Sequence, residues 1–90
     1  MKILRMASAG TLESSDALVM VSPGDGALVI EIESVVLPQF GGAIRAAVEA
    51  VAGEMGVAAG LVQVNDRGAL DCTLRARVET ALKRGTEAAQ

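Results

Sequence analysis

The sequence of 90 residues contains no histidine, tryptophan or tyrosine, one cysteine and one phenylalanine. Without histidine, the chain has no imidazole that could act as a general base and activate a serine or cysteine as a nucleophile. A zinc site would have to be built almost entirely from carboxylates, which is atypical. The single cysteine, Cys72, excludes an intramolecular disulfide and with it a secreted, disulfide-rich scaffold. The chain is therefore poorly equipped for catalysis by its own side chains.

Aromatic rings and excess positive charge are also missing. Phe40 is the one aromatic residue, and the formal net charge is −3. Because nucleic acids are bound through basic surfaces, and single strands also through aromatic stacking, we expect no nucleic-acid partner. No apolar run approaches the roughly 18 residues of a membrane span, and residues 1–6 do not resemble a signal peptide. We therefore expect a cytoplasmic protein with no membrane partner.

The chain does contain many aliphatic residues at regular spacings, and its length predicts one domain over residues 1–90. Residues 18–22 are apolar and β-branched, which predicts a strand. Residues 28–33 alternate with a period of two and predict a half-buried strand. Between them, the turn-forming residues 22–26 predict that the two strands form a β-hairpin. The side chains expected to face the core from the second strand are Leu28, Ile30 and Ile32.

The period changes to that of a helix after Pro38, which suits the first turn of a helix. One apolar stripe follows at helical spacing, formed by Phe40, Ile44, Val48, Val51 and Met55. Gly56 is the expected C-cap of this helix. Two early glycines, Gly41 and Gly42, either allow close approach of another surface or mark a frayed first turn.

A second helix is predicted over residues 69–84. Its apolar stripe consists of Leu70, Leu74, Val78 and Leu82. Gly85 is expected to end the helix, and residues 86–90 to form a loose C-terminal tail.

The predicted fold class is α+β. Residues 61–64 form a short third strand, and residues 3–6 are the candidate for a fourth. The strand, strand, helix, strand, helix order predicts a two-layer sandwich, in which a small, mostly antiparallel sheet of three to four strands carries two helices on one face. The helix between the second and third strands permits a parallel, right-handed crossover.

Two adjacent hydroxyls lie in the small, polar segment 9–16. Ser14 and Ser15 are either ordinary turn serines that bond to the local backbone, or a modification target. Glu31 and Glu33 share a strand face, and we interpret them as its solvated side rather than as paired acids or metal ligands.

Three arginines and the cysteine leave similar alternatives. Arg67, Arg75 and Arg77 are either a phosphate-binding set or the solvated side of the last helix. Cys72 is either a reactive thiol near a helix N-terminus or a small, partly buried apolar residue.

Three blocks of sequence resemble one known family. Residues 10–16, Gly-Thr-Leu-Glu-Ser-Ser-Asp, closely resemble the modification segment of the acyl carrier subunit (gamma chain) of citrate lyase. The second block is Gln-Phe-Gly at 39–41 followed by Ala-Ile-Arg at 43–45. The third is Asp-Arg-Gly-Ala-Leu-Asp-Cys at 66–72, continuing through 74–77.

The resemblance implies a carrier with no catalytic residue of its own. In the family, the serine that follows Gly-Thr-Leu-Glu carries 2'-(5''-phosphoribosyl)-3'-dephospho-CoA through a phosphodiester, and this position is Ser14. Ser15 stands where relatives often have glycine and is the alternative attachment site. The attachment segment, residues 9–16, is then expected to be exposed and mobile. The four-helix bundle of fatty-acid carrier proteins is not expected, because their Asp-Ser-Leu motif is absent.

The implied partners are the alpha and beta subunits of citrate lyase and a prosthetic-group transferase. The resemblance implies that the alpha subunit exchanges acetyl for citryl on the arm's thiol. The beta subunit would then cleave the citryl thioester to oxaloacetate. Carrier subunits of citramalate lyase and, more remotely, of malonate decarboxylase are alternatives, as is an unmodified α+β scaffolding subunit.

Overall fold

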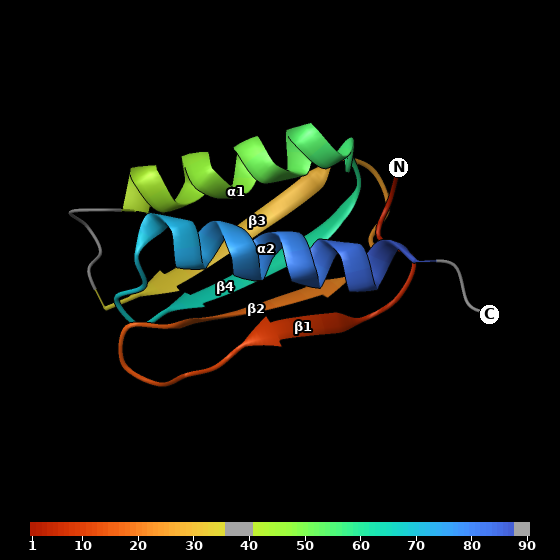
Figure 1. The fold of residues 1–90 in the computed structure, drawn as a ribbon. Helices are drawn as coiled ribbons and strands as arrows, with labels where there is room; N and C mark the ends of the chain where they lie inside the picture. Colours follow the sequence, from red (N-terminus) through yellow and green to blue (C-terminus); the bar gives the residue numbers. More distant parts are fainter. Residues whose placement is uncertain (36–40, 88–90) are drawn as a thin grey trace.

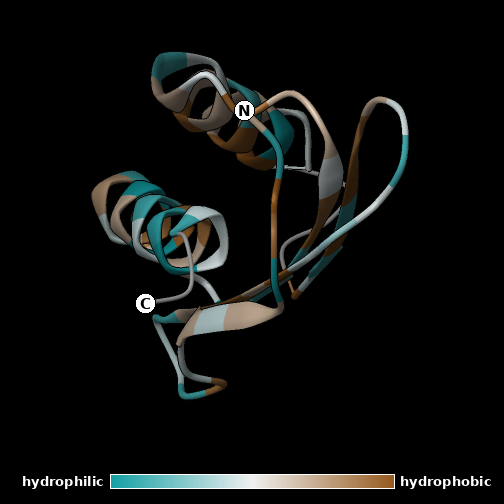
Figure 2. Ribbon diagram, turned by 90° about the vertical axis from the view of Figure 1, so that its right-hand side faces the viewer, coloured by the Kyte–Doolittle hydropathy of each residue, from teal (hydrophilic) through white to brown (hydrophobic). Residues whose placement is uncertain are grey.

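The computed structural model describes residues 1–35 and 41–87, which form a sheet layer and a helix layer (Figure 1). The strands are β1 (Ala7–Gly10), β2 (Ala17–Ser22), β3 (Leu28–Ser34) and β4 (Gly60–Asp66). The helices are α1 (Gly41–Met55) and α2 (Asp71–Thr86). Both helices cover the same face of the sheet (Figure 2), so the predicted α+β two-layer sandwich is confirmed.

The strand order in the sheet is β1-β2-β4-β3. The prediction that residues 18–22 and 28–33 form a β-hairpin is wrong, because the strands that contain them, β2 and β3, are not neighbours. β4 lies between β2 and β3, antiparallel to β2 and parallel to β3. The connection from β2 to β3 passes across the start of β4, since a Cβ on Gly24 would lie 3.3 Å from the Cα of Gly60. The turn residues therefore make a bridge over one strand, and the hairpin of this fold is formed by β1 and β2.

The central strands bury their inward side chains completely, whereas the edge strand β3 buries its own only in part. Val19 and Val62 are fully buried beneath the helices. Leu28, Ile30 and Ile32 face the core as predicted and are half-buried, because β3 has a neighbouring strand on one side only. Six residues of the two predicted stripes are buried: Ile44, Val48, Val51, Leu74, Val78 and Leu82. The prediction is wrong for Leu70, which precedes α2 and is 69% exposed, and Met55 is only partly buried.

The fourth strand is β1, Ala7–Gly10, and the expectation of a strand over residues 3–6 is wrong. Residues of this segment instead form hydrogen bonds with the residue that precedes β4 and with the C-terminal end of α2. The amide of Ile3 donates to the carbonyl of Ala59, and the amides of Leu4 and Arg5 donate to the carbonyl of Gly85. Ile3 is buried, and its side chain lies where a Cβ on Gly60 would be. Ile3 therefore contributes its apolar side chain to the core although its backbone does not belong to a strand.

The C-terminal end of α1 agrees with its prediction, whereas that of α2 does not. Gly56 has a φ of 72° and follows the last residue of α1, as a left-handed C-cap does. α2 continues through Gly85 to Thr86. A Cβ on Gly85 would lie 2.6 Å from Cγ2 of Val21, so this glycine permits close packing of α2 on the sheet. The predictions for Pro38, Phe40 and residues 88–90 lie outside the described residues.

Candidate functional site

The predicted modification segment is the loop that joins β1 to β2. Residues 11–16 form this loop, at the end of the molecule where both helices begin (Figure 1). A hydrogen bond of 3.2 Å from the amide of Asp16 to the carbonyl of Glu13 closes a four-residue turn. Ser14 and Ser15 occupy the two central positions of this turn, and both are exposed.

A β-bulge fixes the second half of the turn against the end of β4. The amide of Ser15 donates to the carbonyl of Arg67 at 2.8 Å, and the amide of Arg67 donates to the carbonyl of Asp16 at 2.9 Å. Ser15 has a φ of 65° and is the one described non-glycine residue with positive φ. The third position of such a turn and the first position of such a bulge both favour glycine. Ser15 therefore occupies a site defined by backbone conformation.

The carboxylate of Asp16 accepts most of the side-chain hydrogen bonds of the loop. It accepts the hydroxyl of Thr11 at 2.7 Å, the amide of Ala17 at 2.7 Å and two N–H groups of Arg77 at 3.0 Å each. Arg77, then Thr11 and Ala17, hold the pKa of Asp16 well below its usual range, because each hydrogen bond favours the ionised carboxylate. The same pair raises the pKa of Arg77. The loop is thus exposed as predicted, but it is anchored at Asp16 rather than mobile throughout.

Gly10 allows α2 and β2 to approach the start of the loop. Its φ is 95°, and a Cβ there would lie 1.8 Å from the carbonyl oxygen of Ala17 and 3.1 Å from Cδ of Arg77. The glycine at the start of the Gly-Thr-Leu-Glu segment is therefore required by the packing of the loop.

The hydroxyl of Ser14 makes no hydrogen bond with any residue in the described ranges. It belongs to the first central position of the turn, and its backbone neighbours on the C-terminal side are held by Arg67. No histidine exists to activate it. An exposed, unpartnered serine hydroxyl without a base is suited to being modified and unsuited to acting as a nucleophile of its own.

The three arginines considered as a phosphate-binding set do not act as one. Arg77 pairs with Asp16, and Arg75 forms an ion pair of 2.7 Å with Asp71, one turn before it on α2. Arg67 follows β4 and is exposed beside the loop. The structure therefore assigns each arginine a different neighbourhood.

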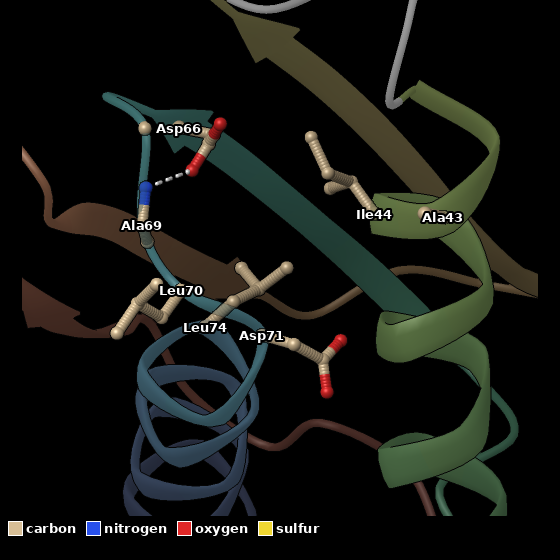
Figure 3. Close-up of a pocket in the computed structure, with 8 residues that line it drawn as sticks. Ala43, Ile44, Asp66, Ala69, Leu70, Asp71 and Leu74 are labelled. Carbon is tan, nitrogen blue, oxygen red and sulfur yellow. Dashed lines mark hydrogen bonds between the residues drawn. The ribbon is translucent and has the colours of Figure 1, made fainter.

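A mainly apolar pocket of about 320 Å³ opens between the first turns of α1 and α2 (Figure 3). Asp66 lies in its wall and is 2 % exposed. Its carboxylate accepts the amide of Ala69 at 3.0 Å and the hydroxyl of Ser34 at 2.8 Å. These bonds hold the turn between β4 and α2, from which Arg67 projects. Neither Ser14 nor Ser15 lines this pocket.

The remaining candidates are not gathered at the loop. Cys72 is exposed in the first turn of α2 and is not the partly buried apolar residue considered as one alternative. Glu31 and Glu33 are exposed on β3, and Glu31 accepts a hydrogen bond from Gln63. Within residues 1–35 and 41–87, no group of three or more His, Cys, Asp or Glu side chains is placed to hold a metal ion. No helix in these ranges is long and apolar enough to cross a membrane.

Sequence reasoning missed the roles of Asp16, Thr11 and Gly10. The sequence does contain a local signal for the first two, because short polar side chains in a loop commonly bond to one another and to nearby amides. It contains none for the pairing of Asp16 with Arg77, because 61 positions separate them.

Comparison with known proteins covers nearly the whole chain. The family model described as malonate decarboxylase delta subunit matches residues 4–85. The citrate lyase acyl carrier protein of Pectobacterium atrosepticum is 49% identical over 90 residues, which is 100% of this chain and 94% of the relative. That of Albidiferax ferrireducens is 54% identical over 85 residues, covering 93% and 87%. That of Haemophilus influenzae strain PittEE is 54% identical over 87 residues, covering 97% and 90%.

Proposed function

We propose that this chain is the acyl carrier subunit of a citrate lyase. The chain belongs to the family that contains the malonate decarboxylase delta subunit and the citrate lyase acyl carrier proteins. In this role the chain is a non-catalytic subunit, and partner subunits perform the chemistry. The composition supports the assignment, since a chain without histidine is suited to carrying a reactive group rather than to acting as one.

The observation that carries the proposal is the exposed hydroxyl of Ser14, which has no hydrogen-bond partner among the described residues. We assign Ser14 as the attachment point of 2'-(5''-phosphoribosyl)-3'-dephospho-CoA, joined by a phosphodiester to its Oγ. The site fits such a group, because the turn presents Ser14 to solvent and Arg67 lies beside it, with no carboxylate partner among the described residues. Ser15, the alternative site, occupies the strained position of the bulge.

When bound, the prosthetic group supplies a terminal thiol that holds the acyl unit as a thioester. The contribution of this chain is to fix the other end. Asp16, Arg77 and Arg67 hold the base of the loop, so Ser14 stays at one end of a rigid domain. A tethered thioester then has a high effective concentration at each active site that it reaches. The partners are the alpha and beta subunits of citrate lyase and the transferase that loads Ser14, all in the cytoplasm.

Intact-mass measurement on the protein purified from its native host tests the proposal. The wild-type chain is expected to carry the mass increment of the prosthetic group, and Ser14→Ala to lack it. Ser15→Gly is the matched control, because it removes the neighbouring hydroxyl while fitting the positive φ. An unmodified wild-type chain would contradict the carrier function. A loaded Ser14→Ala chain would move the attachment to Ser15.

The family model's description favours a second candidate, the carrier subunit of malonate decarboxylase, and a citramalate lyase carrier is a third. Mass analysis of the acyl group that the loaded chain acquires during turnover distinguishes citryl from malonyl and citramalyl. An unmodified scaffolding subunit, the remaining alternative, predicts that Ser14→Ala leaves the activity of the complex intact.

A further inference from the structure

Arg67 is the one member of the three-arginine set that lacks an anionic partner within residues 1–35 and 41–87. Arg77 is paired with Asp16, and Arg75 with Asp71. The guanidinium of Arg67 makes no hydrogen bond or ion pair with the described part of the chain and is exposed. Its positive charge is therefore available to an external anion.

Backbone hydrogen bonds hold Arg67 against Ser15, the residue that follows Ser14. Its carbonyl accepts the amide of Ser15, and its amide donates to the carbonyl of Asp16. These bonds place Arg67 opposite Ser15 and Asp16, so an extended arginine side chain can reach the position next to Ser15 that Ser14 occupies. The two backbone bonds fix this proximity whatever rotamer the side chain adopts.

The chemistry of the arm matches this cation. A phosphodiester on Ser14 and the pyrophosphate beyond it are anions close to the surface, and Glu13 beside them has the same sign of charge. A guanidinium offers several N–H donors in one plane, which suits two phosphate oxygens at once. We propose that Arg67 binds phosphate oxygens of the nucleotide arm attached to Ser14. This inference rests on the proposed function.

The consequence is a division of the arm into two parts. The nucleotide end is held against the turn between β4 and α2, whereas the thiol end remains free to enter partner active sites. Because the pair lies at the exposed surface, the interaction is expected to weaken as ionic strength rises.

The first test uses ¹⁵N-labelled chain in loaded and unloaded forms, identified by intact mass. On loading, the side-chain Nε–Hε resonance of Arg67 is expected to shift and that of Arg75 to stay in place. In loaded Arg67→Gln, the ³¹P resonances of the arm are expected to move toward those of free 3'-dephospho-CoA, and in Arg75→Gln to match wild type. Unchanged Arg67 and ³¹P resonances would overturn the inference while leaving the carrier function intact.

The second test does not require loading and therefore separates the inference from the proposed function. Unmodified chain is titrated with 3'-dephospho-CoA, with pantetheine as a phosphate-free control. Amide shifts are expected at Ser15, Arg67 and Gly68 with the nucleotide alone, and Arg67→Gln should weaken the binding about two- to fivefold. Arg75→Gln is the matched loss of one charge and should leave the affinity unchanged. Equal weakening by both variants, or no shift at these amides, would contradict a site at Arg67.

Discussion

Arg77 and Asp16 are joined by two parallel hydrogen bonds of 3.0 Å, from Nε to Oδ1 and from Nη2 to Oδ2. The pair links the middle of α2 to the last residue of the loop that bears Ser14. The carboxylate is the more enclosed partner, with 14% of its side chain exposed against 40% for the arginine. A bidentate pair of this kind sets orientation as well as proximity.

Replacing Asp16 by asparagine should remove a pH-dependent part of the stability. The folded-state pKa of Asp16 is depressed below its ordinary value of 3.8. Its stabilisation is therefore complete above the unfolded pKa and is lost as the pH falls toward the folded value. Urea midpoints of wild type and Asp16→Asn should differ by a constant amount from about pH 5 to pH 8, and this difference should shrink progressively as the pH falls below about 4. Asp25→Asn, in the exposed β2–β3 connection, is the control. A difference that persists unchanged at pH 3 would contradict the role assigned to this carboxylate.

Replacing Ser15 by glycine should stabilise the fold. A non-glycine residue in the left-handed region costs about 1 kcal/mol, and glycine relieves this cost. The free energy of unfolding should rise by about 1 kcal/mol in denaturant titrations. Ser14→Gly is the matched control, because Ser14 is not among the residues with positive φ, and it should be neutral or slightly destabilising. Equal effects at both positions would mean that the bulge does not strain Ser15.

Replacing Gly10 by alanine should destabilise the protein strongly. The added Cβ would lie 1.8 Å from the carbonyl oxygen of Ala17, and the φ of 95° disfavours any side chain. Thermal or urea unfolding should show a loss of about 2–4 kcal/mol. The control is Gly42→Ala, since Gly42 has nothing within 4 Å of an added Cβ and lies in α1; this change should stabilise by about 0.5–1 kcal/mol. A Gly10→Ala chain as stable as wild type would show that β1 and β2 can separate at no cost.

Replacing Asp66 by alanine should loosen the turn that positions Arg67. The change leaves the amide of Ala69 without its side-chain acceptor and removes one hydrogen bond of the Ser34 hydroxyl. Loss of these buried bonds should cost about 2–3 kcal/mol in urea unfolding. Hydrogen exchange at Ala69 should also become faster. Asn65→Ala, the adjacent residue on the other face of β4, should change the stability by no more than about 0.5 kcal/mol. Similar losses at both positions would place the effect in the strand rather than in the carboxylate.

Much of the secondary structure follows from the sequence because its causes are local. The apolar stripes of both helices, the alternation in β3 and the cap at Gly56 are properties of neighbouring residues. The exposure of Ser14 also follows from a small, polar segment between apolar ones. The resemblance of residues 10–16 to a known modification segment indicated which serine to consider.

Three features depended on contacts that no local pattern encodes. The order of strands required β4 to insert between β2 and β3, although the turn residues after β2 equally suit a hairpin. Gly85 reads as a helix end, but its missing Cβ instead accommodates Val21. Residues 3–6 read as a strand because of their apolar content, which the core uses through Ile3 alone.

By itself, the sequence determined the fold class, the absence of histidine and Ser14 as the predicted point of modification. Only the tertiary structure decided what surrounds that serine. Two contacts join positions far apart in the chain: the bond between Asp16 and Arg77, and the bulge in which Ser15 bonds to Arg67. The second contact also places the charge of Arg67 beside the loop. Such contacts arise only when the packing of the apolar core has brought their elements together, and this packing depends on all of the elements at once.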